Sequence, residues 1–366
     1  MKKTRKKNLK LSGSYTDTLQ TNKEKIAQDT ELELRVDIDG KHPLNIISGD
    51  LYSNAGGTHN YINSFRFEKI EKIKTLADEI KIIGKEGKFY SEIANFTRIQ
   101  VTLYSESDPL KAEIKLINKT GLESKYLCQH ESNFFRRVIV EHDYEEDAAP
   151  LEPYNTSDLP SPHQHRSRPI GIGEAFAEAG IQMKFLKKKQ CDVPHPQYRS
   201  LGSSVWTQNE LFDAMLKHSS LIKKETQWAV WLFSAIEYVI SDYKGTMVLH
   251  EGENRRGCAV FQNATGWQSA AEQRMRLFIY IHELGHCFNL RHPWSGIPAD
   301  SPEKIEAHAT LSWMNYPWRY YLSEEIRGEE EFWKRFNFKF SDSELIHLRH
   351  GFRNDVIFGG NNKKEI

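Results

Sequence analysis

Residues 280–292 constrain the fold of this chain more than any other segment, because they place three histidines at two different spacings. His282 and His286 are four residues apart, so on one α-helix they lie on the same face, one turn apart. His292 follows six residues after His286, which puts it off that face if the helix continues. For the three imidazoles to act together, the helix must end soon after His286 and the chain must turn back.

The turn is predicted at Asn289. A helix that ends in a left-handed residue can reverse the direction of the chain, and this conformation needs a positive φ. Glycine adopts a positive φ without strain, and asparagine is the next most tolerant residue. We therefore expect a helix that begins near Gln268 and closes at Asn289, so that His292 returns toward the other two histidines.

The pattern His-Glu-x-x-His with a third histidine predicts a zinc site, although the five-residue pattern alone also occurs by chance on ordinary helices. The candidate metal ligands are His282, His286 and His292. Three neutral imidazoles leave the fourth position of Zn²⁺ to water, as in catalytic sites, and the ion lowers the pKa of that water to about 7. Such a site is typical of zinc-dependent peptide hydrolysis. Glu283 would take the proton of the zinc-bound water as the general base and then pass it to the amine that leaves when the peptide bond breaks.

A second motif, Ser312-Trp-Met-Asn-Tyr316, follows the third histidine. Together the two motifs resemble those of the metzincin metalloproteases, in which a methionine-containing turn lies beneath the zinc. The Met-x-Tyr form and Pro293 are similar to the serralysin and astacin branches. The resemblance covers about residues 245–350.

The resemblance implies a zinc metalloendopeptidase that acts on protein or peptide substrates. It assigns Met314 to the Met-turn and Tyr316 to stabilisation of the transition state. Asn289 departs from the family pattern, which carries glycine there. Most members of these branches are secreted, whereas this chain begins with a basic stretch that no apolar run follows.

Composition sets wider limits. The chain has 366 residues, and this length suggests two domains. Lys+Arg and Asp+Glu both number 50, so net charge gives no case for a nucleic-acid partner. The four cysteines include no Cys-x-x-Cys pair, which suits a reducing compartment. Since the chain also lacks an apolar stretch of about 18 residues, we expect a cytoplasmic protein without a membrane span.

The order of patterns predicts an α+β protein. Residues 1–30 are expected to be a disordered basic and polar tail. Residues 31–132 alternate with period two and predict an antiparallel, sandwich-like β domain for docking, scaffolding or inhibition. Residues 133–366 are assigned to a metzincin-like protease domain with a mixed sheet, an active-site helix, the Met-turn and a C-terminal helix.

Within the protease domain, several elements are expected from local signals. Helices are predicted over residues 171–179, after the Thr207 cap, over about 225–238 and over about 341–349. Strands are predicted at 181–185, 246–249 and 257–261, and the family pattern makes the last of these the edge strand that binds substrate.

Two alternatives to a protease stay open, and so does the way in which a protease would be restrained. The chain could be a catalytically silent metzincin fold that serves as a zinc-stabilised binding or regulatory module, although a silent copy has no chemical need for Glu283. A structural zinc site fits less well, because such sites usually take four protein ligands and are rich in cysteine. A cytoplasmic protease also needs restraint, which a regulatory partner or a Cys191 thiolate latch on the metal would supply.

Overall fold

A computed structural model describes most of the chain, and the described residues form two compact units. The described ranges are 10–17, 30–53, 60–76, 78–91, 96–159, 167–186, 192–200, 202–221, 228–248, 256–266, 268–298 and 301–357. The first unit contains the residues up to Arg136 together with Arg349–Arg353, and the second contains the other described residues from Arg137 onward. None of the described helices is both long and apolar enough to cross a membrane.

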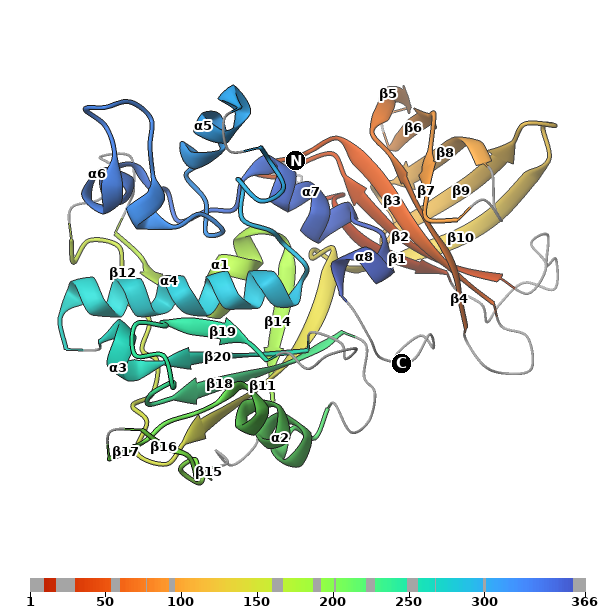
Figure 1. Cartoon of the computed structure of the whole chain (residues 1–366). Helices are drawn as coiled ribbons and strands as arrows, with labels where there is room; N and C mark the ends of the chain where they lie inside the picture. Colours follow the sequence, from red (N-terminus) through yellow and green to blue (C-terminus); the bar gives the residue numbers. More distant parts are fainter. Residues whose placement is uncertain are drawn as a thin grey trace, which may run out of the picture. The chain divides into compact units, whose positions relative to one another are not determined.

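A single antiparallel sheet of ten strands forms the first unit, in the order β5-β6-β8-β9-β10-β1-β2-β3-β4-β7 (Figure 1). Its strands are β1 (Gly13–Asp17), β2 (Thr30–Asp37), β3 (Ile46–Ser53), β4 (Asn60–Phe67), β5 (Lys69–Leu76), β6 (Glu79–Lys85), β7 (Lys88–Phe89), β8 (Phe96–Tyr104), β9 (Lys111–Asn118) and β10 (Glu123–Ser132).

This sheet is curled rather than folded into two layers. Only Glu68 separates β4 from β5, yet β5 forms one edge of the sheet and β4 lies next to the other. The two ends must therefore approach each other, which gives a half-barrel with one apolar core. Leu32, Leu34 and Val36 show the expected period-two alternation, and all three are fully buried in that core. The predicted antiparallel β structure is confirmed, but a single curled sheet replaces the expected sandwich.

Part of the predicted tail belongs to this sheet. Strand β1 lies between β2 and β10, and its Tyr15 is fully buried. The expectation of disorder is therefore wrong for residues 13–17, because a short polar sequence gains two strand partners that are distant along the chain. Residues 1–9 and 18–29 of the tail lie outside the described part of the chain.

The face of β2 and β3 opposite the apolar core carries a buried network of charges in the first unit. Arg35 Nη1 donates to Asp50 Oδ2 at 2.7 Å, and Arg349 Nη1 donates to Asp37 Oδ2 at 2.9 Å. The His350 ring contacts Ser48 Oγ at 2.9 Å and Asp37 Oδ2 at 3.2 Å. Residues 349–353 thus complete a unit whose strands all precede residue 133.

The second unit contains a mixed sheet in the order β14-β11-β18-β20-β19, with β15 beside β11. Strands β11, β18 and β20 pair in parallel, and β19 is an antiparallel edge strand. The strands are β11 (Arg136–Glu145), β14 (Ile181–Phe185), β15 (Asp192–Val193), β18 (Ala229–Ala235), β19 (Gly245–Met247) and β20 (Gly257–Phe261), with two small pairs β12 (Tyr154–Asn155), β13 (Pro169–Ile170), β16 (Arg199–Ser200) and β17 (Ser203–Ser204).

Two predictions for this sheet are wrong. Residues 229–235 form strand β18 rather than part of a helix, and all seven are buried. A central parallel strand is covered on both faces, so its sequence lacks the alternation of apolar and polar residues that identifies a strand. The spacing of its Trp and Leu residues also resembles that of a buried helix face. Strand β20 is not the edge strand either, because β19 covers its outer side.

Helix α4 packs on β19 and β20 (Figure 1), and α1 packs on β14. The Thr207 and Ser341 caps and the predicted helix over residues 171–179 are confirmed. The helices are α1 (Ile172–Glu178), α2 (Gln208–His218), α3 (Gln262–Thr265), α4 (Ala270–Cys287), α5 (Pro302–His308), η3 (Pro317–Arg319), α6 (Gly328–Arg335), α7 (Asp342–His350) and α8 (Arg353–Val356).

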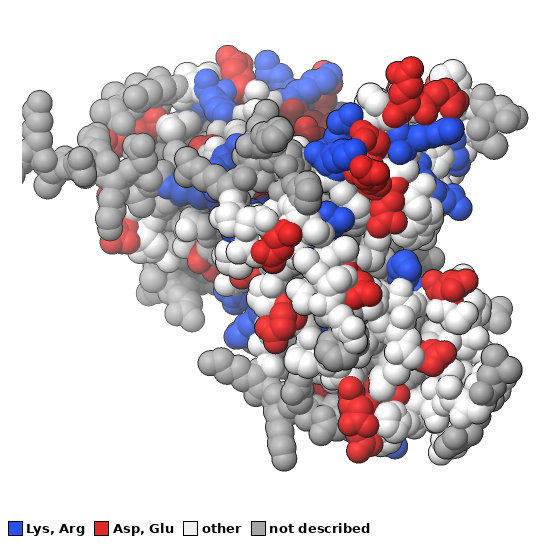
Figure 2. Space-filling model, turned by 90° about the vertical axis from the view of Figure 1, so that its left-hand side faces the viewer, with Lys and Arg blue, Asp and Glu red and all other residues white. Residues whose placement is uncertain are grey.

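Acidic and basic side chains are interspersed on the face of the molecule in Figure 2, and the described residues there form no field of a single sign. This face lends nucleic-acid binding no electrostatic support. The absence of a nucleic-acid partner stays a prediction.

Candidate metal centre

The end of α4 brings the third histidine back to the other two. Asn289 has a φ of 58°, as predicted. The Leu290 amide donates to the Gly285 carbonyl at 3.0 Å and the Asn289 amide to the His286 carbonyl at 2.9 Å. These are the two hydrogen bonds of a Schellman motif, which satisfies the last helix carbonyls and reverses the chain. The Asn289 side chain adds a bond to the Asp355 carbonyl at 2.9 Å.

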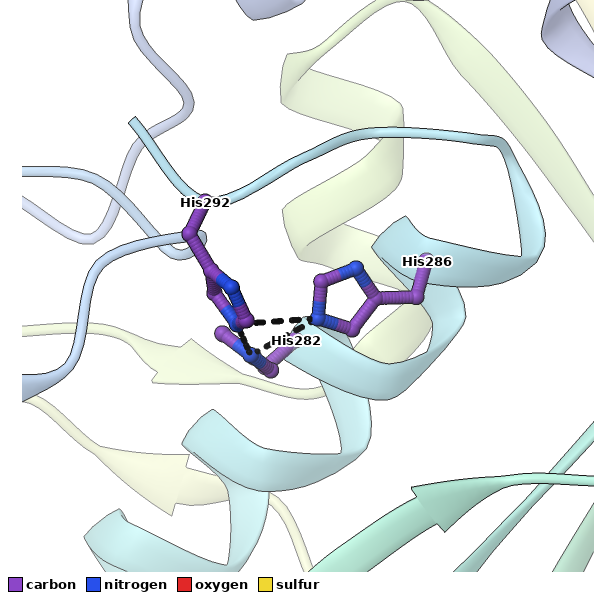
Figure 3. A group of neighbouring side chains, drawn as sticks. All are labelled: His282, His286 and His292. Atoms are coloured by element: carbon purple, nitrogen blue, oxygen red, sulfur yellow. Dashed lines mark hydrogen bonds between the residues drawn. The ribbon is translucent and has the colours of Figure 1, made fainter. Parts of the chain in front are cut away.

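The three imidazoles point at one another (Figure 3). His282 and His286 project from α4, and His292 comes from the segment that follows the turn. The Nε2 atoms of His282 and His286 are 3.1 Å apart, and each is 3.2 Å from the Nε2 atom of His292. A tetrahedral zinc ion with Zn–N bonds of 2.0–2.1 Å holds its ligand nitrogens about 3.4 Å apart. The spacing therefore suits a small cation.

Backbone carbonyls fix the protonation of two of the rings. The Nδ1 atom of His282 lies 2.8 Å from the Trp313 carbonyl, and that of His286 lies 2.8 Å from the Leu290 carbonyl. Each Nδ1 must therefore carry the hydrogen, and in the neutral ring each Nε2 presents a bare lone pair. Two such lone pairs cannot form a hydrogen bond with each other. A cation held by these rings would relieve the repulsion, and the carbonyls would orient the ligands.

Burial keeps the His282 and His292 rings neutral. Burial, followed by the nearby His286 and His292 rings, lowers the pKa of His282 well below its usual value. Burial also lowers the pKa of His292 to about 3, with further contributions from His286 and Arg319. Neutral imidazole is the form that binds metal, so these rings are prepared as ligands at neutral pH.

Met314 lies directly beneath this site. It is fully buried, and a Cβ atom added at Gly285 would overlap its Sδ atom. The missing side chain in α4 thus makes room for the methionine under the turn that carries His282 and His286. Ser312 fixes the turn at Met314 from the other side, because its hydroxyl donates to Glu344 and accepts a hydrogen bond from the Met314 amide at 3.0 Å.

Glu283 is buried beside the histidines, with 8% of its surface exposed. Its side chain forms no hydrogen bond with any described residue, and burial raises its pKa to about 8. A cation in the neighbouring site would favour the charged carboxylate and lower this pKa. The group is therefore suited to exchange a proton near neutral pH.

Tyr316 also lies at the histidine cluster. Its ring centroid is 4.5 Å from that of His292 and 5.3 Å from that of His282, and the ring is half-buried. Burial raises the pKa of its hydroxyl, and the nearby Glu283 adds to the shift, so the hydroxyl stays a hydrogen-bond donor at neutral pH. The Trp318 ring stacks on Tyr316 at 4.7 Å and is 45% exposed, which makes it part of the outer rim.

The structure brings together every residue that the motifs singled out, namely His282, Glu283, His286, His292, Met314 and Tyr316. Cys287 is fully buried and Cys191 lies outside the described residues, so the latch is untested. The sequence reasoning missed Gly285, Glu344 and the two backbone carbonyls. Of these, only Gly285, a helix breaker inside a helix, carried a local signal.

Among the described residues, His282, His286 and His292 form a group that can hold a metal ion. Comparisons with protein-family models, with curated proteins and with solved structures found no match to this chain.

Proposed function

We propose that this protein is a zinc-dependent metalloendopeptidase of the metzincin type. The convergence of three imidazole Nε2 atoms, two of them with bare lone pairs, carries the proposal, because three histidine nitrogens are a donor set that zinc prefers. Three protein ligands leave a coordination position open, which is the arrangement of a catalytic site. Glu283 and Tyr316 beside the open position supply groups that a structural site does not require.

The sheet supports the same proposal. Strand β19 forms an edge, so one side of its backbone has no strand partner among the described residues. It also lies against α4, the helix that carries Glu283. We infer that an extended peptide pairs with β19 through main-chain hydrogen bonds, as in other cases of strand addition. This pairing would lay the scissile bond along the histidine cluster.

The proposed roles follow from the positions. A zinc ion bound by His282, His286 and His292 supplies Lewis-acid activation of water and of the scissile carbonyl. Glu283 would accept a proton from the attacking water and return it to the leaving amine, since its buried carboxyl group lies next to two of the metal-site histidines on α4. The Tyr316 hydroxyl donates a hydrogen bond to the oxygen that gains negative charge.

The remaining assignments are part of the proposal. Residues 133–366 would form the protease domain, and residues 31–132 would dock substrate, support the protease or inhibit it. We expect a cytoplasmic location and a partner or contact that restrains cleavage.

One experiment separates the protease from its rival, a catalytically silent fold used as a zinc-stabilised module. Purified wild type, Glu283→Ala and Glu283→Gln are compared for bound zinc and for cleavage of a peptide library with and without chelator. We expect about one zinc per chain in all three, and chelator-sensitive cleavage by wild type alone. Bound zinc without cleavage by wild type would favour the silent module, and undiminished cleavage by Glu283→Ala would remove this residue from the mechanism.

A further inference from the structure

A glycine of the edge strand faces the candidate general base. On α4, Ile279, Glu283 and Cys287 follow one another at four-residue spacing and form one stripe. This stripe packs over β19, where Gly245 faces Ile279 and Glu283, and Met247 Sδ lies 3.6 Å from Cys287 Sγ. Gly245 and Met247 point to the same side of the sheet, as strand alternation requires.

The contact at Gly245 leaves no room for a side chain. A Cβ atom there would lie 2.7 Å from Glu283 Cγ, 3.0 Å from Glu283 Oε1 and 2.8 Å from Ile279 Cγ2. Carbon atoms pack without repulsion at about 3.5–4.0 Å, so even one methyl group would displace its neighbours. The backbone does not require glycine at this position, because the φ of Gly245 is not positive. The packing against Glu283 and Ile279 is what requires it.

Packing is also what holds the carboxylate of Glu283. The described residues give its side chain no hydrogen bond, and its Cγ and Oε1 atoms lie against Gly245. A buried carboxyl group is usually fixed by hydrogen-bond partners. Here the space between α4 and β19 determines where the carboxylate lies.

We propose that Gly245 is a positioning residue, whose missing side chain creates the space in which the Glu283 carboxylate lies at the metal centre. The proposal rests on the proposed function for its catalytic consequence, but the contact itself can be tested without activity. It also predicts a link between substrate binding and the base, because Gly245 belongs to the strand that we expect to bind the peptide.

The first test is a double-mutant cycle on thermal unfolding, measured on zinc-loaded protein. Gly245→Ala is introduced into wild type and into Glu283→Ala, while Ile279 is present in both. We expect Gly245→Ala to lower Tm by about 3 °C or more in wild type and by clearly less in Glu283→Ala, where the overlap with Glu283 is gone. An equal shift in both backgrounds would overturn the proposed contact.

The second test is kinetic and uses a matched glycine. Gly173 in α1 has no neighbour closer than 3.8 Å to an added Cβ, so Gly173→Ala is the control. We expect Gly245→Ala to retain zinc and the wild-type KM for a peptide substrate while kcat falls about 10–100-fold, since small misplacements of catalytic groups cost this much. Gly173→Ala should be unchanged in all three.

The possible outcomes distinguish the two proposals. A kcat for Gly245→Ala within twofold of wild type would overturn the positioning role. A raised KM at constant kcat would also overturn it, because the strand would then act on substrate binding alone. Zinc-loaded wild type that cleaves nothing would contradict the proposed function, and the stability cycle would then decide whether Gly245 sets the position of Glu283.

Discussion

Two buried polar clusters among the described residues, one in each unit, are organised in opposite ways. In the first unit, Arg35 pairs with Asp50, and Asp37 receives both Arg349 and His350. In the second unit, the Nε2 atoms of three histidines face one another, and those of His282 and His286 carry bare lone pairs. The first cluster pairs cationic donors with carboxylate acceptors. The second brings acceptor nitrogens together and can hold a metal ion, so the first cluster stabilises the fold whereas the second is suited to a ligand.

The largest effect should come from removing a ligand of the second cluster. His286→Ala leaves two of three imidazoles, and we expect zinc affinity to fall by more than the 10–100-fold that loss of an outer partner costs. Proteolysis should disappear with the metal. Zinc titration and peptide cleavage measure both, and His218→Ala, at the end of α2, is the matched histidine control. Wild-type zinc affinity in His286→Ala would show that the cluster is not a metal site.

Breaking the first cluster should affect stability instead. Asp50→Ala leaves Arg35 buried without its main partner, which we expect to cost about 3–5 kcal/mol of unfolding free energy. Chemical denaturation measures this cost. The control is Glu68→Ala, which removes the ion pairs of Glu68 with Arg66 and Lys88. Because the Glu68 side chain is 35% exposed, this change should cost at most about 1 kcal/mol of unfolding free energy. Equal costs for the two variants would contradict the difference between a buried and an exposed pair.

Overfilling the floor of the metal centre should have a smaller effect. Gly285→Ala forces Met314 away from α4, and overpacking of this kind costs about 1–3 kcal/mol. Because Met314 supports the turn that carries His282 and His286, zinc affinity should fall as well. Calorimetry and zinc titration test both effects. Gly285→Ala together with Met314→Ala should recover part of the loss, and no recovery would show that the methionine is not the obstacle.

The smallest effect concerns pH and the first cluster. Burial lowers the pKa of His350 to about 4, although Asp37 opposes the shift, whereas an unfolded histidine has a pKa of about 6.5. The unfolded chain therefore takes up the proton first as pH falls. The contribution of His350 to stability is complete above pH 6.5 and is lost as pH falls toward 4, by on the order of 1–2 kcal/mol at pH 5.

Urea unfolding at pH 7 and pH 5 measures this loss. His350→Gln removes the titrating group, so its stability should depend less on pH in this window. An unchanged dependence would assign the effect to other buried groups, such as His142, whose pKa burial lowers to about 3.

The sequence predicted those features that depend on near neighbours in the chain. The spacing of His282 and His286, the left-handed Asn289 and the Ser341 cap each need only a few adjacent residues, and the structure contains all three. Strand β18 was mistaken for helix because an apolar run carries no period when both faces are buried. The edge strand was misplaced because strand order is a long-range property.

The partners of the site were also beyond local reasoning. Trp313 lies 31 residues from His282, and the Ser312–Glu344 contact spans 32 residues. Such contacts depend on how the elements pack, which no spacing in the sequence reports. Asn289, by contrast, acts on the residues directly around it, and its effect on His292 could be foreseen.

The place of residues 349–353 in the first unit has a consequence for the order of events during synthesis. Domains generally fold as they emerge, beginning at the N-terminus. All ten strands of the half-barrel leave the ribosome long before Arg349 and His350, the partners of Asp37. The first sheet can form early, but it stays incomplete until residue 353 has been made. A chain that stops short would leave Asp37 without these partners, so the N-terminal sheet is completed only after nearly all of the second unit has been synthesised.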